Sequence, residues 1–128
     1  MADGKAKDTP EQAEFRKACR QWLSENHPGD PTVAIPQSAL EINDRDALDW
    51  LKAWQKSAYE AGLVGCDYPK EVGGGGHNNC QAIANDELRR AATPYFPNIS
   101  GLGMAAPAVF FHAREDVKAE LLPRLFSC

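Results

Sequence analysis

Four consecutive glycines, Gly73–Gly76, interrupt the middle of the chain, and neither a helix interior nor a strand interior tolerates such a run cheaply. On both sides of this run, apolar residues recur at intervals of three and four, which is the spacing of amphipathic helices. We find no alternation of apolar and polar residues long enough for a strand, and no internal repeat. The sequence therefore predicts an all-α domain, in which about five helices form an antiparallel bundle around a glycine-rich turn, Tyr68–Gly76.

The first helix is expected to begin at Pro10. Thr9 offers an N-cap hydroxyl, Pro10 suits the first helical position, and Gln12 can complete a capping box. The prolines of the segment His27–Pro31 are expected to end this helix, because proline lacks an amide donor and disfavours helical geometry just before it. Apolar residues at helical spacing are expected to form its inward face: Phe15, Ala18, Cys19, Trp22 and Leu23.

Four more helices are expected after a loop that runs to about Asn43. The second helix is expected to have its cap at Asn43 or Asp44 and to stop at Gly62. The third is expected to have its cap at Asn78 or Asn79 and to end near Ala91, and the fourth to have its cap at Ser100 and to end near His112. The fifth is expected to start at Glu115. Pro107 is expected to kink or shorten the fourth helix, and Pro123 to disturb the last turn of the fifth. The residues expected to face inward are Ala47, Trp50, Leu51, Trp54 and Ala58 in the second helix, Cys80, Ile83, Ala84, Leu88 and Ala91 in the third, and Val117, Leu121, Leu122 and Leu125 in the fifth.

Charge and hydropathy exclude several classes of function. The formal net charge of -4 offers no basic surface for a phosphate backbone, so no nucleic-acid partner is expected. The longest apolar run, Met104–Phe111, is far shorter than the ~20 residues of a transmembrane helix, so no membrane span is expected. Residues 1–8 are expected to be a flexible polar leader that is neither a signal nor a transit peptide, and the four cysteines to be free thiols. A cytoplasmic protein is expected.

Two glycine patterns resemble phosphate-binding motifs. The segment Gly101–Ala106 fits the spacing G-x-G-x-x-A of dinucleotide-binding turns, but that motif needs a preceding strand, and none is predicted. The run Gly73–Gly76 lacks the lysine and hydroxyl that follow the glycines of a P-loop. We favour the interpretation that the first pattern lets another backbone or a ligand lie close to the helix. The second pattern is interpreted as a flexible turn.

Few side chains are candidates for chemistry. Cys66, His77 and Cys80 offer three metal ligands, but their spacing matches no common zinc pattern, so structural thiols, a surface imidazole and no metal are expected. Glu87 falls on the inward stripe of the third helix, where a carboxylate acts as a general base or is paired, for example with Arg89 or Arg90. His112 has the same two interpretations. No nucleophile, base and orienting acid can be assembled, so no catalytic or cofactor-binding residue is assigned.

Four ordered blocks carry a family resemblance: Ala61–Gly74, Asp86–Arg90, Gly101–Pro107 and Leu122–Ser127. With these blocks, the chain resembles the N-terminal helical domain of acyl-CoA dehydrogenases, roughly from Asp44 to Cys128 and more weakly in the first helix. Residues 9–128 are therefore expected to form this domain. The turn between the second and third helices is the strongest match. Members of this family have two helical domains that flank a middle β-domain. They bind FAD and oxidise the Cα–Cβ bond of an acyl-CoA thioester.

The resemblance also implies what this chain lacks. The catalytic base belongs to the C-terminal domain of the family, and most flavin contacts belong to the middle and C-terminal domains. We therefore expect a truncated member that is inactive alone and does not bind FAD by itself. Activity would need the missing domains in cis or a partner subunit in trans, with an electron-transfer protein as acceptor. The full-length enzyme is expected to be a homo-oligomer.

What this domain contributes in the family is a wall of the acyl pocket. The resemblance assigns that wall to the segment before and within the fourth helix, here Phe96, Ile99, Leu102, Gly103 and Met104. Glycines at 101 and 103 would leave width for a bulky or branched acyl chain. A role of these residues in filling a helix interface is the alternative. For the whole chain, the alternatives are a non-catalytic helical interaction module, an inactive truncated paralogue, or a relative of acyl-CoA oxidases.

Overall fold

The computed structural model describes residues 7–128 and contains five α-helices: α1 Pro10–Asn26, α2 Arg45–Glu60, α3 Gln81–Arg90, α4 Ala106–His112 and α5 Glu115–Ser127. Three single turns accompany them: η1 Ala39–Glu41 and η2 Lys70–Val72, which are 3₁₀ turns, and η3 Gly101–Ala105, which is a π-turn. There is no strand in residues 7–128, so the predicted all-α class is confirmed. Except for Lys7 and Asp8, the predicted leader at 1–8 lies outside the described residues.

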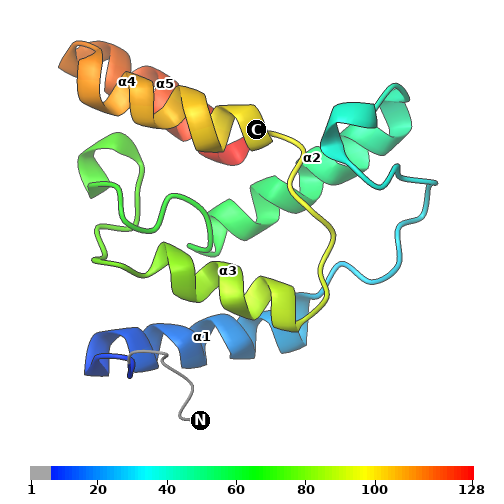
Figure 1. Ribbon diagram of the computed structural model, residues 1–128, viewed down its shortest axis with the longest axis horizontal. Helices are drawn as coiled ribbons and strands as arrows, with labels where there is room; N and C mark the ends of the chain where they lie inside the picture. Colours follow the sequence, from blue (N-terminus) through cyan, green and yellow to red (C-terminus); the bar gives the residue numbers. More distant parts are fainter. Residues whose placement is uncertain (1–6) are drawn as a thin grey trace, which may run out of the picture.

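The helices form two pairs with α2 between them (Figure 1). Helices α1 and α3 lie side by side and run in the same direction, whereas α4 and α5 form an antiparallel hairpin on the opposite side. Helix α2 packs against α5 and runs antiparallel to it. None of the helices in residues 7–128 has the length and apolar character needed to cross a bilayer.

The start of α1 and the end of α2 follow the predictions. The Gln12 amide donates to Thr9 Oγ1 at 3.2 Å and the Thr9 amide donates to Gln12 Oε1 at 2.9 Å, which completes the expected capping box. Helix α1 ends before His27, as the prolines predict. Gly62 follows α2 with a φ of +88°, a conformation that glycine adopts without strain.

Helix α3 begins later than predicted, and neither asparagine caps it. The amides of Cys80 and Gln81 donate instead to the two carboxylate oxygens of Asp67, at 2.7 and 3.2 Å. Asp67 precedes the glycine-rich turn, and the turn brings its carboxylate to the positive end of α3. The cap is therefore a long-range contact, which local sequence signals do not reveal.

Helix α4 also has a different cap. The Gly101 amide donates to Asn98 Oδ1 at 3.1 Å, so Asn98 takes the role predicted for Ser100. The π-turn η3 runs directly into α4, and Pro107 is the second residue of α4. The predicted helix is thus shortened to seven α-helical residues. In contrast, α5 continues through Pro123 to Ser127, so the predicted disturbance of its last turn is wrong.

The core lies where α2, α5 and the glycine-rich turn meet, with Trp54 stacked on Trp22 of α1 at a centroid distance of 6.0 Å. Most of the predicted inward residues are buried. Ala18 is an exception because it is exposed on α1. In α2 and α5, two buried residues were not among those predicted to face inward, Gln55 and Phe126, which are 0% and 1% exposed.

Candidate functional site

An apolar cavity of about 270 Å³ lies between the glycine-rich turn, α3, the segment before α4, and α5. Three of the five predicted acyl-wall residues line it, Phe96, Leu102 and Gly103. Its other lining residues are Val64, Gly65, Tyr68, Gln81, Asn85 and Phe126. The cavity has the character of a ligand pocket, because its lining is largely apolar and carries only a few polar groups.

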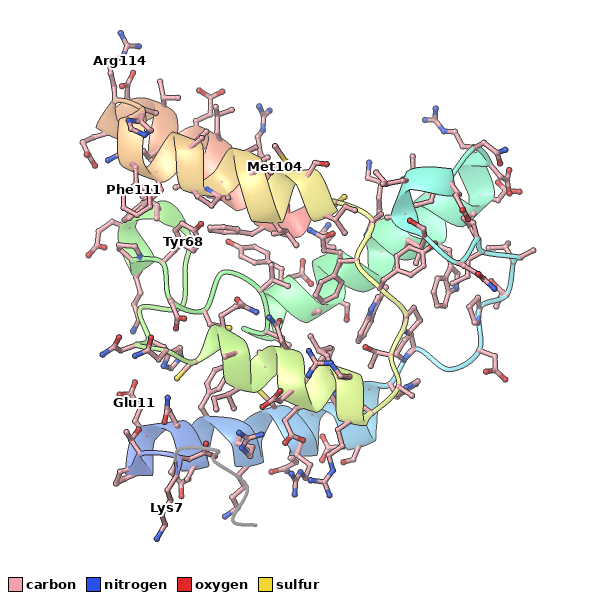
Figure 2. The ribbon with its side chains drawn as sticks, viewed as in Figure 1. Lys7, Glu11, Tyr68, Met104, Phe111 and Arg114 are labelled. Atoms are coloured by element: carbon pink, nitrogen blue, oxygen red, sulfur yellow. The ribbon has the colours of Figure 1, made fainter. Side chains whose placement is uncertain are left out.

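Ile99 and Met104 do not line this cavity. They are 45% and 74% exposed, and Figure 2 shows Met104 on the outer edge of its helix, whereas Tyr68 lies on the inner side. The π-turn explains the difference in part, because its wider winding changes the direction in which successive side chains point. The predicted wall is therefore divided between the cavity and the surface.

Aromatic rings fix the shape of the cavity. The Tyr68 ring lies 4.9 Å from that of Phe126 and meets that of Phe110 edge-on at 5.3 Å, measured between centroids. Phe96 packs against Trp54 at 6.0 Å. Gly65 has a φ of +70°, and a Cβ there would lie 3.0 Å from the Phe126 ring. A residue larger than glycine at 65 would therefore push this ring out of place.

The buried amide of Gln55 holds the cavity wall in position. Its Oε1 accepts a hydrogen bond from the Asn98 amide at 3.3 Å, and its Nε2 donates to the Phe126 carbonyl at 2.9 Å and to the Leu125 carbonyl at 3.3 Å. Asn98 Nδ2 donates to the same Leu125 carbonyl at 3.0 Å. One side chain of α2 thus joins the segment that carries Phe96 to the last turn of α5, whose carbonyls have no partner within the helix.

The glycine-rich turn is closed by its own hydrogen bonds. The amides of Gly73–Gly76 donate to the carbonyls of Lys70, Pro69, Gly65 and Tyr68 at 2.8–3.0 Å. The Tyr59 hydroxyl donates to the Gly73 carbonyl at 2.8 Å. Because all four amides donate to backbone carbonyls of residues 65–70, they do not form a phosphate cradle. The turn instead orients Tyr68 toward the cavity and supplies Asp67 to α3.

Glu87 is a buried ion-pair residue. Arg16 Nη1 donates to its Oε1 at 3.1 Å, and Arg20 donates from Nε and Nη2 to both oxygens at 3.0 and 2.9 Å. The partners are thus arginines of α1, not Arg89 or Arg90. The hydrogen bonds from Arg20, followed by those from Arg16, hold the pKa of Glu87 below its usual value. A carboxylate held in its ionised form by three hydrogen bonds is suited to joining α1 to α3, not to general-base catalysis.

Replacing Glu87 with glutamine is expected to lower the free energy of unfolding by about 2 kcal/mol at neutral pH, because charged hydrogen bonds to two arginines are lost. Since the folded-state pKa is depressed, this stabilisation is present above the ordinary glutamate value of 4.5 and is lost as pH falls through the folded-state pKa. Urea denaturation at neutral and at acidic pH should therefore show a difference from wild type that shrinks on acidification.

The matched control for this variant is Asp86→Asn, one residue earlier in α3. The Asp86 side chain is 40% exposed, pairs with Arg89 at 3.1 Å and lies 3.7 Å from Arg16, so its removal is expected to cost less than about 1 kcal/mol. Equal losses for the two variants, or a Glu87→Gln effect that does not change between neutral and acidic pH, would contradict the role given to the ion pair.

The three side chains weighed as metal ligands, Cys66, His77 and Cys80, do not all come together. Cys66 Sγ donates to the Gly62 carbonyl at 3.2 Å, and burial raises the pKa of Cys66 to about 12, so it is an inert thiol. His77 and Cys80 lie close together, and Glu11 of α1 joins them in place of Cys66. His112 is exposed at the end of α4. The part of the chain that the structure describes brings none of these residues into the cavity.

The structure is thus a helical domain with an apolar cavity that the glycine-rich turn and the segment 96–103 both border. The chain belongs to the acyl-CoA dehydrogenase N-terminal domain family, whose sequence model matches residues 9–128. The resemblance drawn from the four sequence blocks is thereby confirmed.

Among curated proteins, the chain is similar to acyl-CoA dehydrogenase IpdE1 of Mycolicibacterium smegmatis (strain ATCC 700084 / mc(2)155). The two are 28% identical over 113 residues, which cover 88% of this chain and 29% of the relative. The chain therefore spans less than a third of that relative's length. No solved structure matches the chain significantly.

Proposed function

We propose that this chain is the N-terminal helical domain of an FAD-dependent acyl-CoA dehydrogenase and contributes one wall of the acyl pocket. The observation that carries the proposal is the apolar cavity, to which Phe96, Leu102 and Gly103 contribute. Such a wall suits the hydrocarbon part of an acyl thioester, which gains by leaving water, and it offers no charged group to the CoA end. The proposed reaction is α,β-dehydrogenation of an acyl-CoA thioester.

The residues of this chain do not fit FAD itself. The amides of Gly73–Gly76 are bonded to backbone carbonyls of residues 65–70, and the Gly101 amide is bonded to Asn98, so these glycine amides are not free to bind a pyrophosphate. The cavity of about 270 Å³ is also small for a dinucleotide, since pockets for drug-sized ligands measure roughly 300–1,000 Å³. We therefore assign flavin binding and the catalytic base to the other domains of the family, in the same chain or in a partner chain.

Gly103 is the residue that sets the width of the proposed wall. A Cβ at 103 would meet nothing within 4 Å, so packing does not require glycine there. At 101, in contrast, a Cβ would overlap the Asn98 side chain, so that glycine serves the helix cap. We propose that the missing side chain at 103 leaves room for branched or ring-bearing acyl chains.

The test is Gly103→Val in the enzyme assembled with the other domains of the family. We expect kcat/KM for ring-bearing acyl thioesters to fall by roughly 10- to 100-fold relative to straight-chain thioesters, because a few added carbons in a pocket discriminate by that factor. The open space around residue 103 means that the variant should fold normally.

Met104→Val is the control, since the neighbouring side chain is 74% exposed and lies outside the cavity. This variant is expected to leave the ratio of the two kcat/KM values unchanged. The proposed wall would be wrong if Gly103→Val reduced turnover of both classes equally, or if Met104→Val changed the ratio as strongly.

A second candidate function is that of a non-catalytic helical interaction module. It is favoured by two exposed apolar side chains, Met104 and Phe111, which are 74% and 73% exposed. Large exposed apolar side chains are typical of association surfaces when they form a patch. In that case the purified chain would associate without any other domain, and Phe111→Lys would weaken the association in analytical ultracentrifugation. A chain that remains monomeric at high concentration argues against this candidate.

A further inference from the structure

Three side chains with metal-binding atoms converge away from the apolar cavity. Glu11 comes from the first turn of α1, whereas His77 and Cys80 come from the segment that joins the glycine-rich turn to α3. The Glu11 carboxylate, the His77 imidazole and the Cys80 thiol each place one ligand atom within 4.8 Å of the other two. The chain folds α1 onto α3 to bring these residues together, since Glu11 and His77 are 66 positions apart.

The spacing of these atoms is close to that of a tetrahedral metal site. The distance between His77 Nδ1 and Glu11 Oε1 is 3.3 Å. Two ligands bonded to zinc at about 2.0–2.2 Å in tetrahedral geometry lie roughly 3.3–3.6 Å apart, so this pair already has the required separation. The Cys80 sulfur lies within 4.8 Å of the other two ligand atoms, so it needs an approach of up to about 1 Å, and the Glu11 side chain, 61% exposed, has room to move toward it.

The surrounding contacts hold the three residues in place. The His77 ring packs against Phe15 with a centroid distance of 4.8 Å. Gln12, next to Glu11, donates from Nε2 to the Asn79 carbonyl at 3.1 Å, and the Cys80 amide donates to Asp67 at 2.7 Å. The ligand-bearing segments are thus fixed to each other by bonds that do not involve the ligand atoms, which is how metal sites are preorganised.

We infer that Glu11, His77 and Cys80 form a site for a zinc ion, with water as the fourth ligand. A nitrogen, a sulfur and a carboxylate oxygen are the donors that zinc accepts, and a thiolate disfavours magnesium and calcium. The site opens to solvent on the side of Glu11 and His77, whereas Cys80 is fully buried. This gives the ion an entry path and leaves room for the water.

Binding requires that the Cys80 thiol lose its proton. A zinc–sulfur bond therefore forms as the S–H bond breaks, and the proton goes to solvent, so the affinity should increase with pH.

The experiment is a titration of the chain with Co²⁺, a spectroscopic substitute for zinc, followed by competition with Zn²⁺. We expect a cobalt–thiolate charge-transfer band and tetrahedral d–d bands that saturate at one ion per chain, and that Zn²⁺ abolishes. Glu11→Gln, His77→Gln and Cys80→Ser should each weaken binding by at least about 100-fold, since even the loss of a supporting contact around a metal costs 10- to 100-fold. Zn²⁺ should also raise the Tm of wild type and not that of the variants.

Matched controls separate this site from general ion binding. Glu14→Gln in α1, His112→Gln in α4 and Cys128→Ser at the chain end change the same residue types outside the cluster and should leave the titration unchanged. Because Glu11 is exposed, Glu11→Gln should fold even if Cys80→Ser does not. Absence of the thiolate band, a band that survives Glu11→Gln and His77→Gln, or an equal loss in the control variants would overturn the inference.

Discussion

Replacing Phe126 with alanine is expected to lower the free energy of unfolding by about 4 kcal/mol, because truncation of a buried aromatic removes its burial energy and leaves a void. Phe126 is 1% exposed, and its ring lies 5.9 Å from that of Tyr59 and 4.9 Å from that of Tyr68. A loss of this size is a large share of the ~5–15 kcal/mol that stabilises a typical domain. Urea denaturation of the purified chain measures it.

Phe111→Ala is the matched control for this prediction. Phe111 is 73% exposed in the neighbouring helix α4, so its truncation is expected to cost less than about 1 kcal/mol. A Phe126→Ala variant as stable as Phe111→Ala would show that the ring is not part of the core. It would also remove the basis for the cavity, since Phe126 forms part of its lining.

Replacing Gln55 with leucine is expected to cost about 3 kcal/mol, although leucine has nearly the same volume and is apolar. The Asn98 amide loses its acceptor and the Phe126 carbonyl loses its donor, and each unpaired buried group costs roughly 1–3 kcal/mol. The effect should also be local. Hydrogen exchange at the Asn98 amide is expected to accelerate more than exchange in α1.

The control for Gln55→Leu is Gln21→Leu in α1, where the side chain is exposed and donates only a weak hydrogen bond to Glu25 at 3.4 Å. We expect this change to alter the free energy of unfolding by less than about 0.5 kcal/mol. If Gln55→Leu were as stable as wild type, the amide would not be the link between α2, α5 and the segment before α4.

The helices were predictable because their signals are local. The capping box of α1 lies within four consecutive residues, and Gly62 adopts the positive φ expected after α2. The cap of α3 was not predictable in this way, because Asp67 lies 13 and 14 positions before the amides that it accepts from. The same reason explains why the partners of Glu87 were missed, since Arg16 and Arg20 are 71 and 67 positions away.

Gln55 and Phe126, which were not predicted to face inward, carried a usable signal. Gln55 lies four positions after Leu51 and three before Ala58, which places it on the inward face of α2 despite its polarity. Phe126 lies four positions after Leu122, which places it on the inward face of α5. Spacing therefore predicts burial at these positions. The amide hydrogen bonds that make Gln55 acceptable there depend on the tertiary fold.

The candidate cavity could be predicted only in part. The family resemblance assigned a wall to the segment 96–104, and Phe96, Leu102 and Gly103 line the cavity. Met104 lies within a π-turn, Gly101–Ala105, which no local motif marked, and its side chain is exposed. Ile99 lies before this turn and is exposed as well. Tyr68 was outside the predicted set, although it stands at the start of the glycine-rich turn and belongs to the strongest sequence block.

The central claim is that this domain forms a wall of an acyl pocket, and photo-labelling tests it most directly. An acyl-CoA thioester with a photoreactive diazirine at the end of its acyl chain would be irradiated with the enzyme assembled from all domains of the family, and the labelled peptides mapped by mass spectrometry. We expect label on Phe96 or Leu102 that excess unlabelled acyl-CoA competes away. Label confined to exposed residues such as Met104 and Phe111, or no competed label on this chain, would contradict the claim.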